Sequence, residues 1–148
     1  MGLNRSRFAG RGIALIRIVM GCMLIYSGYL KFIAMGPTIG FFGMIQIPAP
    51  EIIAPIIATG EVLGGFLLLV GLGMRYVPFW FIPMFIVTTL YVKLPREAPI
   101  FGYDAARIDI MLLVGSVLLV LEGAGAFALD TYLARRRAGQ EVVARATA

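Results

Sequence analysis

Histidine is absent from the chain, cysteine occurs once, and charged residues make up only 14% of its 148 residues. Without histidine there is no imidazole ligand for a metal ion and no bis-histidine haem site. Cys22 cannot form a disulfide within the chain, and we expect it to be a small packing residue. P-loop, Rossmann and serine-elbow motifs are also missing. The sequence therefore predicts no metal site and no covalently bound or metal-liganded cofactor, and it favours a chain that is not an enzyme on its own.

Apolar residues are what the sequence has in excess. Hydrophobic residues make up 60% of the chain, and the mean hydropathy is +0.92. A soluble domain of this length has too much surface relative to its volume to bury so many apolar side chains. The apolar residues also occur in long runs. The composition therefore predicts an integral membrane protein embedded in the lipid bilayer.

Four apolar runs are predicted to span the membrane, at about residues 12–34, 51–72, 76–92 and 105–125. A helix of roughly 22 residues is about 33 Å long, enough to cross a hydrocarbon core of about 30 Å. Pro83 should kink the third helix. The fourth helix should end in the glycine-rich stretch that follows Glu122. The expected fold class is all-α, a four-transmembrane-helix bundle.

Two connections between these spans differ in character. Residues 35–50 contain glycines and prolines that oppose a continuous helix, together with aromatic and branched side chains that oppose a solvated loop. We expect an irregular interfacial segment there, between helices 1 and 2. Residues 93–104, which begin at Lys93, look like a plain polar connection.

The distribution of arginine predicts the orientation. Arginines cluster in residues 1–11, recur at Arg75 between the second and third spans, and cluster again in residues 131–148. Four spans place these three regions on one side, and the positive-inside rule makes both termini cytoplasmic. Residues 1–11 and 131–148 are then basic cytoplasmic ends of a membrane domain at 12–130. The net charge of +5 is therefore read as membrane orientation, with no nucleic-acid partner.

Glu61 is an ionisable residue near the middle of the second span. A charged side chain at that depth costs about 2.5–3.5 kcal/mol on insertion scales, so it must be protonated, paired or placed beside a wet cavity. Arg17, Lys31 and Arg107 are the candidate partners, and depth favours Lys31 or Arg107. Three roles remain open for Glu61: locking helix packing, taking part in proton, ion or quinone-headgroup binding, or contacting another subunit.

Other polar and small residues suggest helix contacts. Asp104 and Arg107 lie three residues apart on one helix face and are predicted to pair at the outer interface, while Asp109 should point the other way. Small residues allow helices to approach closely in a membrane. The predicted packing glycines are Gly21, Gly28, Gly60, Gly64, Gly65 and Gly71.

Four short motifs occur in a characteristic order. They are GYLK at 28–31, GEVLGG at 60–65, VGLGMR at 70–75 and EGAGAFALD at 122–130. With these motifs, the chain from about Ile16 to Asp130 resembles the DoxX family of small four-helix membrane proteins. The resemblance marks Lys31, Glu61 and Arg75 as the polar residues of the family motifs.

The resemblance also implies a setting. The family's founding member is associated with a thiosulfate:quinone oxidoreductase, and other members are linked to membrane redox and oxidative-stress complexes. We therefore expect a multi-pass protein of a bacterial-type inner membrane that is an accessory or anchoring subunit of a larger redox complex, with other membrane subunits as partners. One alternative is a quinone-interacting subunit with a site near Glu61. Another is a small solute or lipid carrier that acts as a homo-oligomer. Quinone or lipid is the expected ligand.

Overall fold

The computed structural model describes the chain except residues 1–2, 75, 95–102, 124, 133–135 and 137–148, and for 3–9 and 103–105 it describes the backbone only. All regular secondary structure in the described part is helical, which confirms the all-α class. The helices are α1 (Leu3–Ile33), α2 (Met35–Met44), α3 (Pro50–Val70), α4 (Val77–Val87), the π-helix η1 (Thr88–Lys93) and α5 (Tyr103–Glu122).

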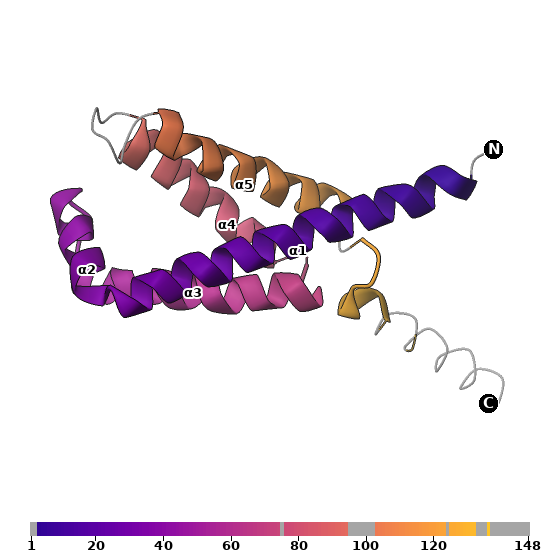
Figure 1. Cartoon of the computed structure of the whole chain (residues 1–148), viewed down its shortest axis with the longest axis horizontal. Coiled ribbons are helices and arrows are strands. Elements are labelled where there is room, and N and C mark those ends of the chain that lie inside the picture. The colour runs from indigo at the N-terminus through magenta and orange to yellow at the C-terminus, as the bar shows by residue number, and fades with distance from the viewer. Residues whose placement is uncertain (1–2, 75, 95–102, 124, 133–135, 137–148) are drawn as a thin grey trace, which may run out of the picture.

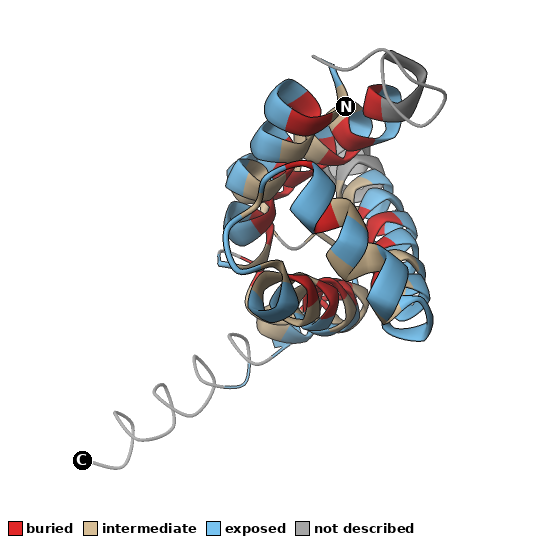
Figure 2. Cartoon of the chain, turned by 90° about the vertical axis from the view of Figure 1, so that its left-hand side faces the viewer, coloured by how far each residue is buried: buried red, intermediate tan, exposed pale blue. Residues whose placement is uncertain are grey.

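The helices form two pairs, as Figure 1 shows. Helix α1 packs along α3, and α4 packs along α5. The pairs meet where the first half of α1 approaches the end of α5, and they diverge toward the opposite end, where α2 lies (Figure 1). Buried residues lie on the faces that the helices turn toward one another (Figure 2). The core cluster consists of Met20, Leu24, Leu68, Met74, Phe81, Phe85, Leu112 and Leu119.

Glycines determine how closely α1 and α3 approach. A Cβ atom added to Gly21 would lie 2.7 Å from the carbonyl oxygen of Gly65, and one added to Gly65 would lie 2.7 Å from that of Gly21. A Cβ on Gly28 would lie 2.7 Å from the carbonyl oxygen of Ala58. Backbone therefore packs directly on backbone along this pair, the contact by which helices associate in lipid.

The remaining packing glycines make different contacts. A Cβ on Gly64 would lie 2.5 Å from the ring of Phe81, so this glycine provides room for α4 against α3. Gly71 ends α3 in the left-handed conformation, with φ of 71°. Gly60 is less crowded, because the nearest atom to its added Cβ is Trp80 Nε1 at 3.7 Å.

The outer surface is strongly apolar. Large hydrophobic side chains are exposed on several helices, among them Leu15, Phe66, Met111 and Leu121. Residues Gly10–Ile33 and Pro50–Val70 are each long and apolar enough to cross a membrane, and Val77–Lys93 is a shorter apolar helix. Cys22 is also exposed, so it is not the packing residue that the sequence predicts. Its neighbour Gly21 takes the position that faces α3.

The prediction of an irregular segment between the first two spans is wrong for its first ten residues, which form α2. Pro37 lies in the first turn of α2, where a helix needs no N–H donor. Gly36, Gly40 and Gly43 would have nothing within 4 Å of an added Cβ, so they lie along an open side of α2. Between α2 and α3 the irregular stretch is limited to residues 45–49.

The helix at the predicted third span ends one residue later than predicted, at Lys93. Helix α4 tolerates Pro83 in its interior and continues into the six-residue π-helix η1. The N–H of Leu94 donates to the carbonyl oxygen of Thr89, 3.0 Å away, in the i→i+5 pattern of a π-helix. Lys93 therefore belongs to the last helical turn, and its assignment to a polar connection is wrong. Helix α5 ends at Glu122 before Gly123, whose φ is 81°, as the sequence predicts.

Candidate functional site

A partly open pocket of about 810 Å³ lies where the two helix pairs diverge. Side chains from α1, α2, α3, α4, η1 and α5 line it, and most of them are apolar. Phe42 and Ile45 border it on the side of α2, and Trp80 and Met84 contribute from α4. Besides the aromatic Tyr26 and Trp80, its polar lining residues are Ser27, Lys31, Glu61, Thr88, Lys93 and Asp109. A large apolar pocket with a few converging polar groups is the usual form of a small-molecule site.

The first polar group in the pocket is an ion pair between α1 and α3. Lys31 Nζ donates to Glu61 Oε2 at 2.6 Å and to Ser27 Oγ at 2.8 Å. Ser27 and Lys31 are four residues apart and so lie on one face of α1. The Glu61 side chain is 7% exposed and that of Lys31 is 25% exposed. Glu61 thus has the polar partner that its depth requires, and Lys31 is one of the two partners that the sequence favours.

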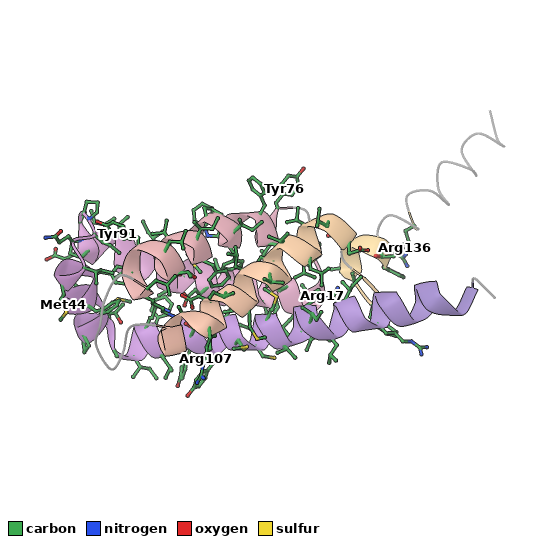
Figure 3. All side chains as sticks on the ribbon, turned by 90° about the horizontal axis from the view of Figure 1, so that it is seen from above. Arg17, Met44, Tyr76, Tyr91, Arg107 and Arg136 are labelled. Atoms are coloured by element: carbon green, nitrogen blue, oxygen red, sulfur yellow. The ribbon has the colours of Figure 1, made fainter. Side chains whose placement is uncertain are left out.

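The second polar group is an ion pair between η1 and α5. Lys93 Nζ donates to Asp109 Oδ1 at 2.8 Å, and the two side chains are 26% and 11% exposed. Asp109 shares a buried face of α5 with Leu112, Ser116 and Leu119. The prediction that Asp109 points away from the Arg107 face is consistent with this arrangement, because Arg107 is exposed and points away from the bundle (Figure 3).

These two pairs use both lysines of the chain, whose other cationic side chains are all arginines. A lysine ammonium is a compact charge with three donor hydrogens, and a carboxylate is an acceptor that can also take up a proton. The four groups together carry no net charge. The pocket therefore combines apolar walls with hydrogen-bond donors and carboxylates that balance one another in charge.

The other charged residues singled out from sequence do not meet in this pocket. Arg107 does not line the pocket, so it is not the partner of Glu61. Its predicted pairing with Asp104 involves a side chain outside the described residues, and Arg75 also lies outside them.

Arg17 is buried at the opposite end of the bundle, only 1% exposed (Figure 3). Its Nη2 donates to the carbonyl oxygen of Phe127 at 3.4 Å. The N–H of Ala126 donates to the Gly10 carbonyl at 2.8 Å, and the N–H of Asp130 donates to the Gly71 carbonyl at 3.1 Å. We call residues 126–132 the strap, because they tie the start of α1 to the end of α3.

Sequence reasoning missed the pair formed by Lys93 and Asp109. The burial pattern of α5 was available as a signal, since Asp109, Leu112, Ser116 and Leu119 recur at helical spacing on one face. Lys93 gave no such signal, because its position depends on the π-helical turn.

Residues 12–94 match the sequence profile of the DoxX family. The chain belongs to the DoxX family. It is 37% identical over 122 residues to the "Putative oxidoreductase CatD" of Bacillus subtilis (strain 168), a match that covers 82% of this chain and 87% of that protein. It is also 29% identical over 133 residues to the "Uncharacterized membrane protein Rv3486" of Mycobacterium tuberculosis (strain ATCC 25618 / H37Rv), covering 82% and 80%.

No solved structure matches the chain. Membership in DoxX makes this chain a membrane protein, and the matched region includes Lys31, Glu61 and Lys93, while Asp109 lies beyond it.

Proposed function

We propose that this DoxX protein is a four-span inner-membrane subunit of a redox assembly and that it binds a quinone in the pocket beside Lys31 and Glu61. The observation that carries the proposal is the short ion pair on the wall of an otherwise apolar pocket. A membrane quinone has an apolar body and a neutral headgroup with carbonyl oxygens. The apolar lining of the pocket suits the body of a quinone, and its lysine can donate a hydrogen bond to a carbonyl oxygen of the headgroup.

The polar groups suit the chemistry of the headgroup. Reduction of a quinone to a quinol takes up two electrons and two protons. The ammonium of Lys31 can donate a hydrogen bond to a carbonyl oxygen and stabilise negative charge that develops on it. Glu61 can exchange protons as the charge on the ring changes. The electrons come from a redox-active partner subunit, so the proposed role is that of a quinone-binding accessory subunit.

Four spans with cytoplasmic termini agree with the arrangement of the helices. The start of α1, the end of α3 and the strap lie at one end of the bundle, where the hydrogen bonds of Ala126 and Asp130 join them (Figure 1). An even number of spans brings these segments to the same membrane face. The pocket lies toward the other end, which this topology places nearer the outer face. The relative named an oxidoreductase supports the redox setting.

Trp80 makes the proposal directly testable, because it is the only tryptophan of the chain and lines the pocket. The protein would be purified in mild detergent and titrated with a short-chain 1,4-quinone, which quenches indole fluorescence at contact. Saturable quenching is expected. The double variant Lys31→Met/Glu61→Leu should weaken it about tenfold, the effect of losing one charge-assisted hydrogen bond. Arg11→Gln, at an exposed position outside the pocket, is the control and should bind as wild type.

Absence of saturable quenching in the wild type would contradict the quinone site, and so would an unchanged affinity in the double variant. The subunit role is tested separately by native mass spectrometry of particles from native membranes. Co-migration with a cofactor-bearing partner is expected. A particle that contains only this chain would contradict the role as a subunit.

A further inference from the structure

We propose that Lys93 and Asp109 form a second contact for the same ligand, so that the pocket selects a ring with two opposed hydrogen-bond acceptors, a 1,4-quinone. This inference rests on the function proposed above and adds a substrate class and two positioning residues to it. Neither residue of this second pair lies in the four sequence motifs.

The placement of the two ion pairs carries the inference. Lys31 and Glu61 join α1 to α3, whereas Lys93 and Asp109 join η1 to α5. The pairs thus belong to opposite halves of the molecule, and all four residues line one pocket. Within the proposal, a ligand ring between the helix pairs accepts a hydrogen bond from a lysine of each half. A ligand with a single polar end can use only one of them.

Each lysine has donor capacity left for a ligand. Among the described residues, Lys31 donates to Ser27 and Glu61, and Lys93 donates to Asp109. An ammonium group has three hydrogens, so at least one remains on Lys31 and two remain on Lys93. The carbonyl oxygens of a quinone need only donors, and the existing ion pairs stay intact when they bind.

The charge balance of the pocket further restricts the class of ligand that fits it. Two ammonium groups and two carboxylates leave the pocket neutral. A fatty acid or a phosphate would add a negative charge beside two carboxylates that already balance the two lysines, and this partly buried charge would have no counter-ion. A neutral diacceptor binds without that cost. The pocket therefore favours a 1,4-quinone over anionic lipids of similar size.

The π-helix places the second lysine. A change from α-helical to π-helical hydrogen bonding alters the direction in which the following side chains point, and π-helical turns occur frequently at functional sites. Lys93 is the last residue of η1, and its neighbour Val92 is buried. The irregular turn thus directs Lys93 toward Asp109 and the pocket.

The test compares two ligands on one matched variant. Lys93→Met/Asp109→Leu replaces the pair with apolar side chains, a change that proteins usually tolerate without loss of stability. Quenching of Trp80 gives the affinity for a short-chain 1,4-quinone, and competition gives the affinity for a ring of the same size and tail with a single carbonyl. The variant should bind the quinone about tenfold more weakly and the monocarbonyl ring as wild type does.

Equal weakening of both ligands would overturn the inference, because the pair would then only maintain the pocket. Unchanged binding of the quinone would overturn it too. Either result is compatible with the proposed function, provided that the wild type binds quinone and that Lys31→Met/Glu61→Leu weakens binding. If the wild type binds no quinone, the function proposed above fails, and the second contact fails with it.

Discussion

Lys31 Nζ and Glu61 Oε2 lie 2.6 Å apart across the contact between α1 and α3, although the two residues are 30 positions apart in the sequence. Gly28 allows this approach, because a Cβ there would lie 3.0 Å from the Cβ of Glu61 and 2.7 Å from the Ala58 carbonyl oxygen. A small residue one turn before the lysine thus brings the carboxylate within its reach. The GYLK and GEVLGG motifs thus lie on the two sides of one contact.

Substitutions of Lys31 and Glu61 should have non-additive effects on the free energy of unfolding. Lys31→Met leaves Glu61 without its ammonium partner in a site where its side chain is only 7% exposed. We expect a loss of about 1–3 kcal/mol in the free energy of unfolding. Lys31→Met/Glu61→Leu should recover most of that loss. Thermal unfolding in detergent measures both, and a double variant no more stable than the single one would contradict the coupling.

Close packing of α1 on α3 predicts a strong effect at Gly65. A Cβ there would lie 2.7 Å from the Gly21 carbonyl oxygen and 2.9 Å from the backbone nitrogen of Ile25, and neither atom can move without its helix. Gly65→Ala should therefore lower the free energy of unfolding by about 1–3 kcal/mol. Gly12→Ala is the matched control, since nothing lies within 4 Å of its added Cβ. That control should leave stability unchanged or raise it slightly. Equal effects at the two positions would contradict the packing role.

Gly71 and Gly73 allow backbone strain to be separated from steric contact. Their φ values are 71° and 67°. An alanine at either position should therefore lose a similar conformational free energy, about 1–2 kcal/mol. Only at Gly71 would the new Cβ also meet Arg17 Nη1 and, at 2.8 Å, Ala128 Cα. Gly71→Ala should therefore lower the unfolding temperature more than Gly73→Ala. Equal shifts of the unfolding temperature would mean that the close contact of Gly71 with Arg17 and Ala128 contributes nothing measurable to stability.

Arg17 should hold the strap without affecting the pocket. Arg17→Met removes the donor to the Phe127 carbonyl. We expect faster hydrogen exchange at the amides of Ala126 and Asp130, whose hydrogen bonds join the strap to Gly10 and Gly71. Quenching of Trp80 by quinone should not change, because Arg17 does not line the pocket. Arg11→Met, at an exposed position on α1, is the control. This role of Arg17 would be contradicted if the quenching of Trp80 changed while hydrogen exchange in the strap did not.

The sequence predicted the helices well where apolar periodicity and local breakers act together. The predicted second span at 51–72 agrees with α3 (Pro50–Val70), and Gly123 marks the end of α5 as expected. The predictions failed where the tertiary environment of a residue outweighed its intrinsic conformational preference. The glycines of α2 tolerate a helix because they lie on an open side, and the polar Lys93 continues a helix because an ion pair satisfies it inside the bundle.

The sequence by itself determined the all-α class, the membrane character and the need of Glu61 for a polar partner. These features follow from composition, the length of apolar runs and the cost of an ionised group in lipid, all of which are local properties. Only the tertiary structure decided that Lys31 is that partner, that Lys93 meets Asp109, and that both pairs line one pocket. These contacts depend on how each helix is rotated and on one π-helical turn. Rotation is set by packing between helices far apart in the sequence, so no single segment encodes it.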